Sequence, residues 1–570
     1  MKIKTTLLCI SAAFISNAQG LNQEITIDKE IVPEQRAATR LDVSHSILSP
    51  VLPAQNLSVS ERDLGINSDI YHNPVNPVFD FNNASQSRGY LSAGFFPTIN
   101  ANIAAGYKFI CNKNTSLAAA LFYSGAQYDQ NTPLEIADDK VKDHNFDISL
   151  NLSHKFSNTS RLNIATGFGI ASAQYHYYDE DKNFSPVTDF YPDFYKSGNT
   201  HFFLNGDYTA LAGDLTYSIG ANFAIHSNST DDEAMPYLYH TSLPELDGIS
   251  EKAFSICADV KNNTYGLNLS ASFLNYNNFN SYDTYNTNNY VFNEGKTTGI
   301  VTAKPYYLFE NELIKAKIGL KAEISVNSGK KFHLAPDIRI DALFHRHFTA
   351  YTKITGGLLQ NSLSALYSYS HFLNPLLAYE NSNMPLDASV GLIFGPLKGS
   401  YLKVYGGYTY CDDYLILAGA PHTNYLTYSD IKQWYGGAEA QFSFRNIFDI
   451  NAQYVINPAE YRRDQASAAA SIALTIKPLD RLSVSPDYTY VIGRKQLYCN
   501  MLETGAFYPE HINNRSLGNF SSLNISALYS FTGNFSAFIS LKNILAHDNV
   551  IAQDLMAQKF HGLAGVNIKF

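Results

Sequence analysis

Apolar and polar residues alternate strictly over long stretches of this 570-residue chain, and this period of two constrains the fold more than any other feature. The clearest case is LIKAKIGLKAEISV, residues 313–326. Successive side chains of a strand point to opposite faces, so such a stretch predicts a strand with one apolar and one polar face. The apolar residues placed in this way on one face of their strands are Ile314, Ile318, Leu320, Ile324, Leu150, Leu152, Leu269, Ile539 and Leu541.

The predicted strands are too long for an ordinary soluble sheet. Each alternating stretch continues for about ten to fifteen residues, whereas strands of soluble proteins average about five or six. Aromatic residues make up 14% of the chain and gather near the expected strand ends, as in QYHYYDE and VYGGYTY. Strands that cross an outer membrane need about ten residues and carry aromatic girdles at both interfaces. We therefore expect the apolar faces defined above to contact outer-membrane lipid.

The sequence predicts no transmembrane helix, because no stretch approaches about eighteen consecutive apolar residues. Only helices and closed sheets satisfy every backbone group in lipid, so a chain without such a helix must enter a membrane as a closed barrel. The predicted fold class is all-β, a transmembrane antiparallel β-barrel that covers residues 88–570.

The N-terminus indicates export. Residues 1–20 combine Lys2 and Lys4 with a short apolar core and a small-residue site at Ser16–Ala18, which is typical of a secretory signal peptide. Residues 21–87 are rich in Pro, Asn, Ser and charge, and we expect them to form a periplasmic or luminal extension. The expected location is the bacterial outer membrane.

Loop lengths provide a strand count. Short connections alternate with long polar ones near 127–140, 179–197, 228–247, 276–295, 412–431, 495–516 and 547–557, and residues 358–384 are interpreted as a further long loop. Outer-membrane barrels have short periplasmic turns and long extracellular loops. This pattern predicts about 22 strands, with both barrel ends facing the periplasm.

The tail FSAFISLKNILAHDN…GLAGVNIKF resembles the C-terminal end of TonB-dependent outer-membrane receptors, in which an asparagine-containing turn precedes a last strand that ends on an aromatic residue. Asn543 and Phe570 occupy those places. The resemblance implies that Val566, Ile568 and Phe570 form the signal read by the barrel-assembly machinery, and we expect the last strand to pair with the first, near RGYLSAGFF. The stretch IVPEQRAATRL resembles the opening of plugless receptor-like barrels from Bacteroides-type bacteria.

The segment before the barrel is too short for the receptors' N-terminal plug domain, so no plug is predicted. An open lumen of this width would leak, and it must be filled by the N-terminal segment, by inward-folded loops or by a partner protein. Two functions remain open. The chain is either a partner-gated, receptor-like transport barrel, or a structural subunit of an outer-membrane assembly or secretion complex with an occluded lumen. Other outer-membrane or periplasmic proteins are expected partners in both cases.

The sequence offers no convincing chemical site. His345 and His347 share one side of a strand, but no third metal ligand is evident. Acidic residues in YYDEDKN and STDDEAM lack the spacing of a calcium loop, and the Asn/Tyr-rich loop NNFNSYDTYNTNNY is typical of exposed loops. No catalytic or cofactor-binding motif is present, and the net charge of −10 argues against nucleic acid as a partner.

Lysines on the polar faces raise the question of a basic lumen. They are Lys315, Lys317, Lys321, Lys403 and Lys542. A basic lumen would favour anionic solutes, but inward charges also simply solvate the interior of a barrel. As a test of the face assignment, we expect Ile318→Arg to destabilise the barrel by about 2–4 kcal/mol and the inward Ser325→Arg to cost far less.

Overall fold

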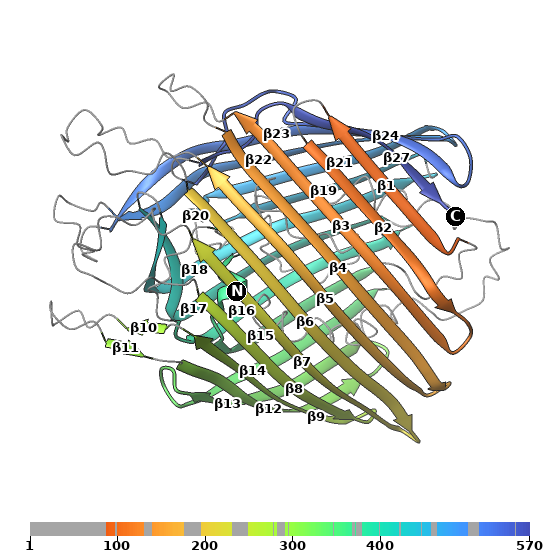
Figure 1. The fold of residues 1–570 in the computed structure, drawn as a ribbon. Coiled ribbons are helices and arrows are strands. Elements are labelled where there is room, and N and C mark those ends of the chain that lie inside the picture. Colours follow the sequence, from red (N-terminus) through yellow and green to blue (C-terminus); the bar gives the residue numbers. More distant parts are fainter. Residues whose placement is uncertain are drawn as a thin grey trace, which may run out of the picture.

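The structure is a computed structural model of the full chain, and 22 antiparallel strands form its closed barrel (Figure 1). It describes residues 87–96, 100–129, 140–175, 195–230, 249–277, 279–281, 291–293, 296–345, 347–367, 371, 379–397, 400–420, 423–445, 447–457, 464–499, 512–552 and 555–570. Within these ranges, no helix is long and apolar enough to cross a bilayer. The one helix described there is α4 (Leu363–Tyr367).

Each strand pairs with its neighbours in chain order. The first half of the wall consists of β1 (Gly89–Phe96), β2 (Asn100–Cys111), β3 (Thr115–Asp129), β4 (Lys140–Ser157), β5 (Ser160–Tyr175), β6 (Tyr195–Ala212), β7 (Leu215–Thr230), β8 (Ile249–Lys261), β9 (Tyr265–Asn277), β12 (Lys296–Glu310) and β13 (Ile314–Val326). The second half consists of β14 (Phe332–His345), β15 (Phe348–Leu359), β16 (Ser382–Leu397), β17 (Ser400–Ala420), β18 (Thr423–Phe444), β19 (Phe448–Ile456), β21 (Ala468–Leu479), β22 (Leu482–Cys499), β23 (Ile512–Ser530), β24 (Phe535–Lys542) and β27 (His561–Lys569).

Smaller strands accompany the wall. They are β20 (Asp464–Gln465), which pairs with β22, and two short hairpins, β10 (Phe279–Ser281) with β11 (Val291–Asn293) and β25 (Val550–Ala552) with β26 (Leu555–Met556). The predicted strand count is confirmed.

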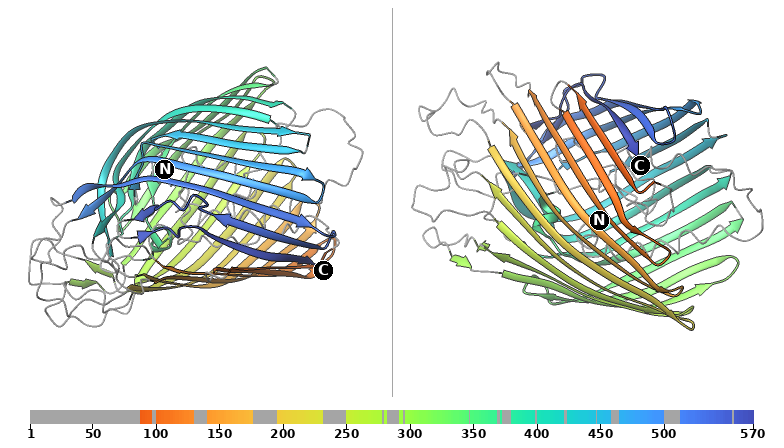
Figure 2. Two further views of the ribbon diagram at one scale, coloured as in Figure 1. Left: turned by 90° about the horizontal axis from the view of Figure 1, so that it is seen from above. Right: turned by 45° about the vertical axis from the view of Figure 1, so that its right-hand side comes forward.

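The barrel closes between its first and last strands, as predicted (Figures 1 and 2). Leu91 lies opposite Ile568, and Gly89 exchanges backbone hydrogen bonds with Phe570 at 2.8 and 3.0 Å. The ring of Phe570 lies where a side chain at position 89 would stand, so any larger residue there would have to displace the ring. The same ring stacks on Tyr107 of β2, with centroids 6.3 Å apart.

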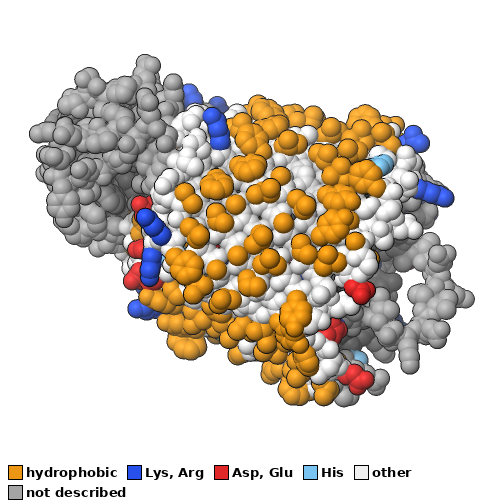
Figure 3. All heavy atoms as spheres, turned by 90° about the horizontal axis from the view of Figure 1, so that it is seen from below, with side chains coloured by type: hydrophobic (Ala, Val, Ile, Leu, Met, Phe, Trp, Pro, Cys, Tyr) orange, Lys and Arg blue, Asp and Glu red, His pale blue; other side chains and the backbone are white. Residues whose placement is uncertain are grey.

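The side-chain distribution is inverted relative to a soluble protein, in which apolar side chains are buried. On β13, Ile324 is 52% exposed, whereas its neighbour Glu323 is 2% exposed. Apolar side chains cover much of the outer surface in Figure 3. The residues predicted to face lipid lie on this pattern: Ile314, Ile318, Leu320, Ile324, Leu150, Leu269 and Ile539 are exposed, and Leu152 and Leu541 are half-exposed. Their contact with lipid stays a prediction.

Exposed aromatic rings follow the end of the barrel that carries the short connections. They are Phe109, Phe156, Tyr265, Phe309, Phe344, Phe394, Phe444, Phe531 and Phe570. Some contact a ring on the adjacent strand: the ring centroids of Phe348 and Phe394 lie 4.9 Å apart. At the other end Trp434 on β18 is 73% exposed and packs against Tyr408. Such bands mark the two interfaces of a membrane barrel.

One predicted loop is wrong. Residues 412–431 were expected to form a long connection, but β17 and β18 continue through them, and the strands are joined at 421–422. The prediction failed because apolar residues are consecutive from Leu415 to Ala418, and the pattern of alternation is lost there. The long connection expected at 358–384 does occur, between β15 and β16.

Candidate functional site: the mouth of the barrel

The site lies at the end with the long connections, and it begins where β15 leaves the barrel wall. The last pair between β15 and β14 joins Thr355 to Asp337, whereas the pairing of β15 with β16 continues to Leu359. The departure occurs at a register shift where Gly357 has a φ of +120°. This value lies in a region that glycine adopts far more readily than other residues.

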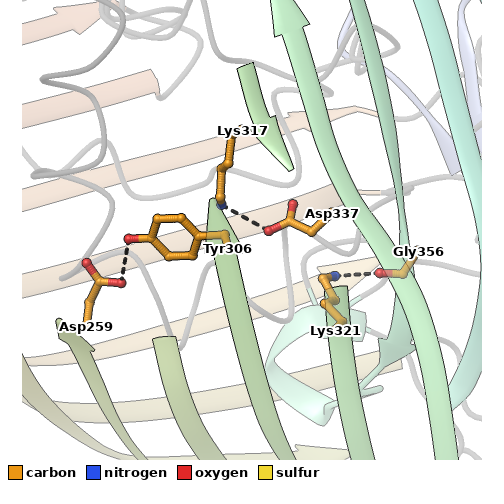
Figure 4. A network of polar contacts seen from close by, with 6 residues as sticks. All are labelled: Asp259, Tyr306, Lys317, Lys321, Asp337 and Gly356. Carbon is orange, nitrogen blue, oxygen red and sulfur yellow. Dashed lines mark hydrogen bonds and ion pairs between the residues drawn. The ribbon is translucent and has the colours of Figure 1, made fainter. Parts of the chain in front are cut away.

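Two side chains of β13 hold the departing strand on the lumen side. The Lys321 ammonium donates to the carbonyl of Gly356 at 2.5 Å (Figure 4). The Glu323 carboxylate accepts the backbone N–H of Leu358 at 2.6 Å. A side chain at Gly357 would overlap the same carboxylate, so this glycine is required both by its conformation and by its neighbour.

The chain then folds into the barrel as what we call the lumen segment: the described residues between β15 and β16, which are 360–367, 371 and 379–381. Ser362 caps α4, because its hydroxyl accepts the N–H of Ala365 at 3.1 Å. Glu251 on β8 accepts the N–H of Leu363 at 2.6 Å and the hydroxyl of Ser364 at 3.1 Å. Its carboxylate is 1% exposed and lies at the helix N-terminus, where the backbone dipoles favour negative charge.

An apolar cluster, which we call the mouth cluster, fixes the segment. It joins α4 to the inner wall and to β17, and its buried members are Ile249, Leu274, Tyr276, Leu363, Leu366, Tyr379, Leu415 and Leu417. Tyr276 and Tyr379 stack with centroids 5.0 Å apart. Burial of each large apolar side chain stabilises by about 1.5–3 kcal/mol. The mouth therefore has a core of its own inside a polar lumen.

Polar contacts attach the lumen segment to further strands. Ser197 on β6 donates to the carbonyl of His371 at 2.6 Å, and the Asn381 amide donates to Ser325 on β13 at 2.9 Å. Ser325 is thus inward, as predicted, but it is 5% exposed and bonded to Asn381, so the expectation that Ser325→Arg would cost far less than Ile318→Arg loses its structural basis. An arginine there would displace Asn381.

The β17–β18 hairpin crosses the same mouth, as the teal strands at the left of Figure 1 show. Both faces of its outer part are buried. Leu415 and Leu417 join the mouth cluster, while Tyr414 and Ile416 pack in a second cluster with Met384. The hairpin tip reaches β22, where residue 419 pairs with residue 498 in parallel orientation. The hairpin forms a strap over the short strands β19 and β21.

A second inward segment follows β24 and includes β25 and β26. Arg494 on β22 is 1% exposed and donates to the carbonyls of Val550 and Ile551 at 2.5 and 3.0 Å. On the opposite side, the Tyr128 hydroxyl of β3 donates to the carbonyl of Met556 at 3.2 Å. Asn543, singled out by the C-terminal resemblance, closes the start of this segment, because its amide contacts the carbonyl of His547 at 3.0 Å.

Below the mouth, a series of charged and aromatic side chains extends from β8 to β14 (Figure 4). The Tyr306 hydroxyl donates to Asp259 at 3.3 Å, and the Lys317 ammonium lies 4.6 Å from the Tyr306 ring centroid and 2.9 Å from the carboxylate of Asp337. Gly266 leaves room for the Tyr306 ring. This series contains positive and negative side chains in mutual contact.

The lysines that suggested a basic lumen are therefore compensated at several positions. Lys315 pairs with Glu310, and Lys403 lies 3.8 Å from Glu439. Together with the Lys317–Asp337 pair, these contacts favour the interpretation that the lysines solvate the interior. Lys542 lies on β24, and Lys321 is committed to Gly356.

The remaining predicted sites are not brought together with the mouth. His345 ends β14 and His347 lies in the short connection before β15, so the two do not share one strand as expected, and no group of three metal-ligating side chains occurs in the ranges that the structure covers. The acidic stretches YYDEDKN and STDDEAM and most of the Asn/Tyr-rich loop lie outside those ranges. Cys111, Cys257 and Cys411 are free thiols.

Comparisons with known proteins identify solved structures that share the fold. No family model matches the chain, and no curated protein matches its sequence. Solved structures do match. A ferric enterobactin receptor from Pseudomonas aeruginosa, in complex with enterobactin, has a TM-score of 0.60 at 11% identity, covering 85% of this chain and 81% of that one. The siderophore receptor PirA from Acinetobacter baumannii has a TM-score of 0.60 at 11% identity, covering 85% and 80%.

The pyoverdine-bound FpvA of P. aeruginosa is similar to the same degree, with a TM-score of 0.60, 11% identity, and coverage of 85% of this chain and 72% of that one. The predicted resemblance to the barrel of TonB-dependent receptors is confirmed at the level of the fold, and the large closed barrel is of the outer-membrane type. The question of a plug falls on residues 1–86, which lie outside the described residues.

Proposed function

We propose that this protein is a transport barrel of the outer membrane whose passage is controlled at its mouth by its own lumen segment. The observation that carries the proposal is the attachment of that segment to the inner wall by Glu251 and the mouth cluster. The fold shared with siderophore receptors supports transport of a solute, and one of the three interior fillers expected from the sequence, an inward-folded loop, is present.

Planar-bilayer conductance of the purified protein tests this proposal. Leu363→Asp and Leu366→Asp each place a charge in the mouth cluster, and we expect either variant to raise the conductance well above that of the wild type. Asn263→Asp adds the same charge at an exposed short turn and serves as the control. Equal, silent traces from all variants, with folding shown by heat-modifiable migration in gels, would contradict gating by this segment.

A second candidate function is a structural subunit of an outer-membrane complex with a permanently occluded lumen. The fully buried Arg494, which fixes a second inward segment, favours this alternative, because a group held so tightly suits a static seal. Stoichiometric co-purification with other outer-membrane or periplasmic proteins, together with silent Leu363→Asp and Leu366→Asp variants, would support it over transport.

We also propose how the chain reaches its site. Residues 1–20 direct export, residues 21–87 occupy the periplasm or the lumen, and Val566, Ile568 and Phe570 form the signal for the barrel-assembly machinery. Insertion of Phe570→Ala into membranes in cells, compared with Phe531→Ala at a neighbouring exposed aromatic, tests the last point. Equal insertion of the two variants would refute a special role of Phe570.

A further inference from the structure

A row of titratable side chains crosses the inner wall from β4 to β9 beside the lumen segment. The strand register places the following residues opposite one another in succession: Asp147, Gly169, His201, His226, Glu251 and Tyr276. Directly opposed side chains on adjacent strands lie about 4.5–5.5 Å apart at Cβ. The row is therefore continuous, and one of its members, Glu251, is the group that holds α4.

One end of the row is a close contact between a histidine and a carboxylate. His201 Nε2 lies 3.0 Å from the Asp147 carboxylate, and the two side chains meet across β5 because Gly169 has none. The Asn145 amide donates to the other oxygen of Asp147 at 3.0 Å. The His201 ring is thus held by a carboxylate of β4.

The centre of the row is His226, a neutral histidine that is shielded from solvent. His226 is 8% exposed, and the Asn199 amide donates to its Nε2 at 2.7 Å, so this nitrogen is an acceptor. The ring contacts Tyr367 of α4 edge-on, with centroids 5.4 Å apart, and Tyr367 stacks on His371 at 4.4 Å. Among the described residues, the titratable side chains beside His226 are therefore His201, Glu251 and Tyr367, with His371 stacked behind Tyr367.

We infer that this row is an acid-sensitive latch, in which protonation of His226 releases the lumen segment from Glu251. A proton from solvent binds Nε2 and replaces the hydrogen bond from Asn199, whose amide must turn away. The resulting cation lies between His201 and the Glu251 carboxylate. Because Glu251 is the only acidic side chain beside it in the described part of the chain, the carboxylate is drawn from the N-terminus of α4 toward the imidazolium.

The sign of the effect follows from solvation. In the closed state the imidazolium would be buried and would compete with α4 for Glu251, whereas release of the segment exposes it to water. The open state therefore binds the proton more tightly, and acid shifts the population toward it. For one proton, the open fraction rises by up to about tenfold for each unit by which the pH falls. This slope applies in the range where His226 is protonated in the open state and still neutral in the closed state.

The latch rests on the proposed function, and conductance between pH 7.5 and 5 separates the two. We expect acid to raise the wild-type conductance several-fold, and we expect His226→Gln, which keeps a hydrogen-bonding side chain but cannot bind the proton, to abolish the rise. His154→Gln is the matched control and should retain the rise in conductance. His154 lies outside the row, on β4 near the short connection to β5, and contacts Thr115.

Each outcome has one meaning. If Leu363→Asp conducts at pH 7.5 while the wild type does not respond to acid, the gate stands and the latch is wrong. A response that persists in His226→Gln also overturns the latch. If neither acid nor Leu363→Asp opens the barrel, the proposed gate itself fails. Heat-modifiable migration of each variant at both pH values confirms that the barrel is folded.

Discussion

Ile318→Arg is the sharpest test of which face of the sheet meets lipid. Ile318 is 48% exposed on the outer face of β13, whereas its neighbour Lys317 points inward and pairs with Asp337. A rise of about 3.3 Å per residue and a tilt of about 40° place Ile318 about 10 Å deeper than Ile314, which adjoins the short turn, so it lies near the middle of an apolar band about 25 Å tall. We expect the substitution to lower the free energy of unfolding by about 2–4 kcal/mol.

Guanidinium unfolding of barrels refolded into lipid vesicles measures this value. Ile314→Arg, near the interface, should cost only about 0–1 kcal/mol. Asn151→Arg on β4 is the inward control, because Asn151 is half-buried and lies opposite the small residues Ala118 and Ala165. If the inward and outward substitutions had equal effects, or if Ile314→Arg cost as much as Ile318→Arg, the assignment of the lipid face would be refuted.

Three further substitutions test the architecture of the mouth and the closure. Gly357→Ala should destabilise the lumen segment by about 1–3 kcal/mol, because φ is positive at this position and Glu323 fills the space. Faster proteolysis between β15 and β16 would report this loss, and unchanged cleavage would contradict it. Arg494→Met should leave two carbonyls unpaired and cost about 1.5–3 kcal/mol, read as faster hydrogen exchange in β25 with unchanged exchange in β13. Gly89→Val should displace the Phe570 ring and lower the melting temperature, and the effect should shrink when Phe570→Ala is added; additive effects would argue against the contact.

The wall was predictable from the sequence, because its determinants are local. Alternation on β13 matches the exposure of its side chains, because along this strand parity decides which side chains face outward and which are buried. The strand count succeeded because long and short connections must alternate around a closed sheet. The last strand was matched to the first from the aromatic tail, and Gly89 opposite Phe570 shows the steric reason.

The mouth was not predictable, because its contacts join residues far apart in the chain. Leu363 and Leu415 share one cluster, and nothing near either residue indicates the other. Glu251 and Arg494 gave only a weak signal, an ionisable residue on the inward parity close to the outer end of its strand. The β17–β18 strap was missed for a related reason: burial of both faces removes the alternation on which the prediction of strands depended.

The seam between β1 and β27 also has a consequence for the order of assembly. These are the first and last strands of the sheet, so their pairing closes the largest loop in the chain and is expected to form late. Until then both strands present unpaired backbone groups, which lipid does not tolerate and which other chains can capture. Closure of this barrel thus depends on both edge strands, because a chain that lacks either of them cannot pair Gly89 with Phe570 and keeps a row of unsatisfied backbone groups.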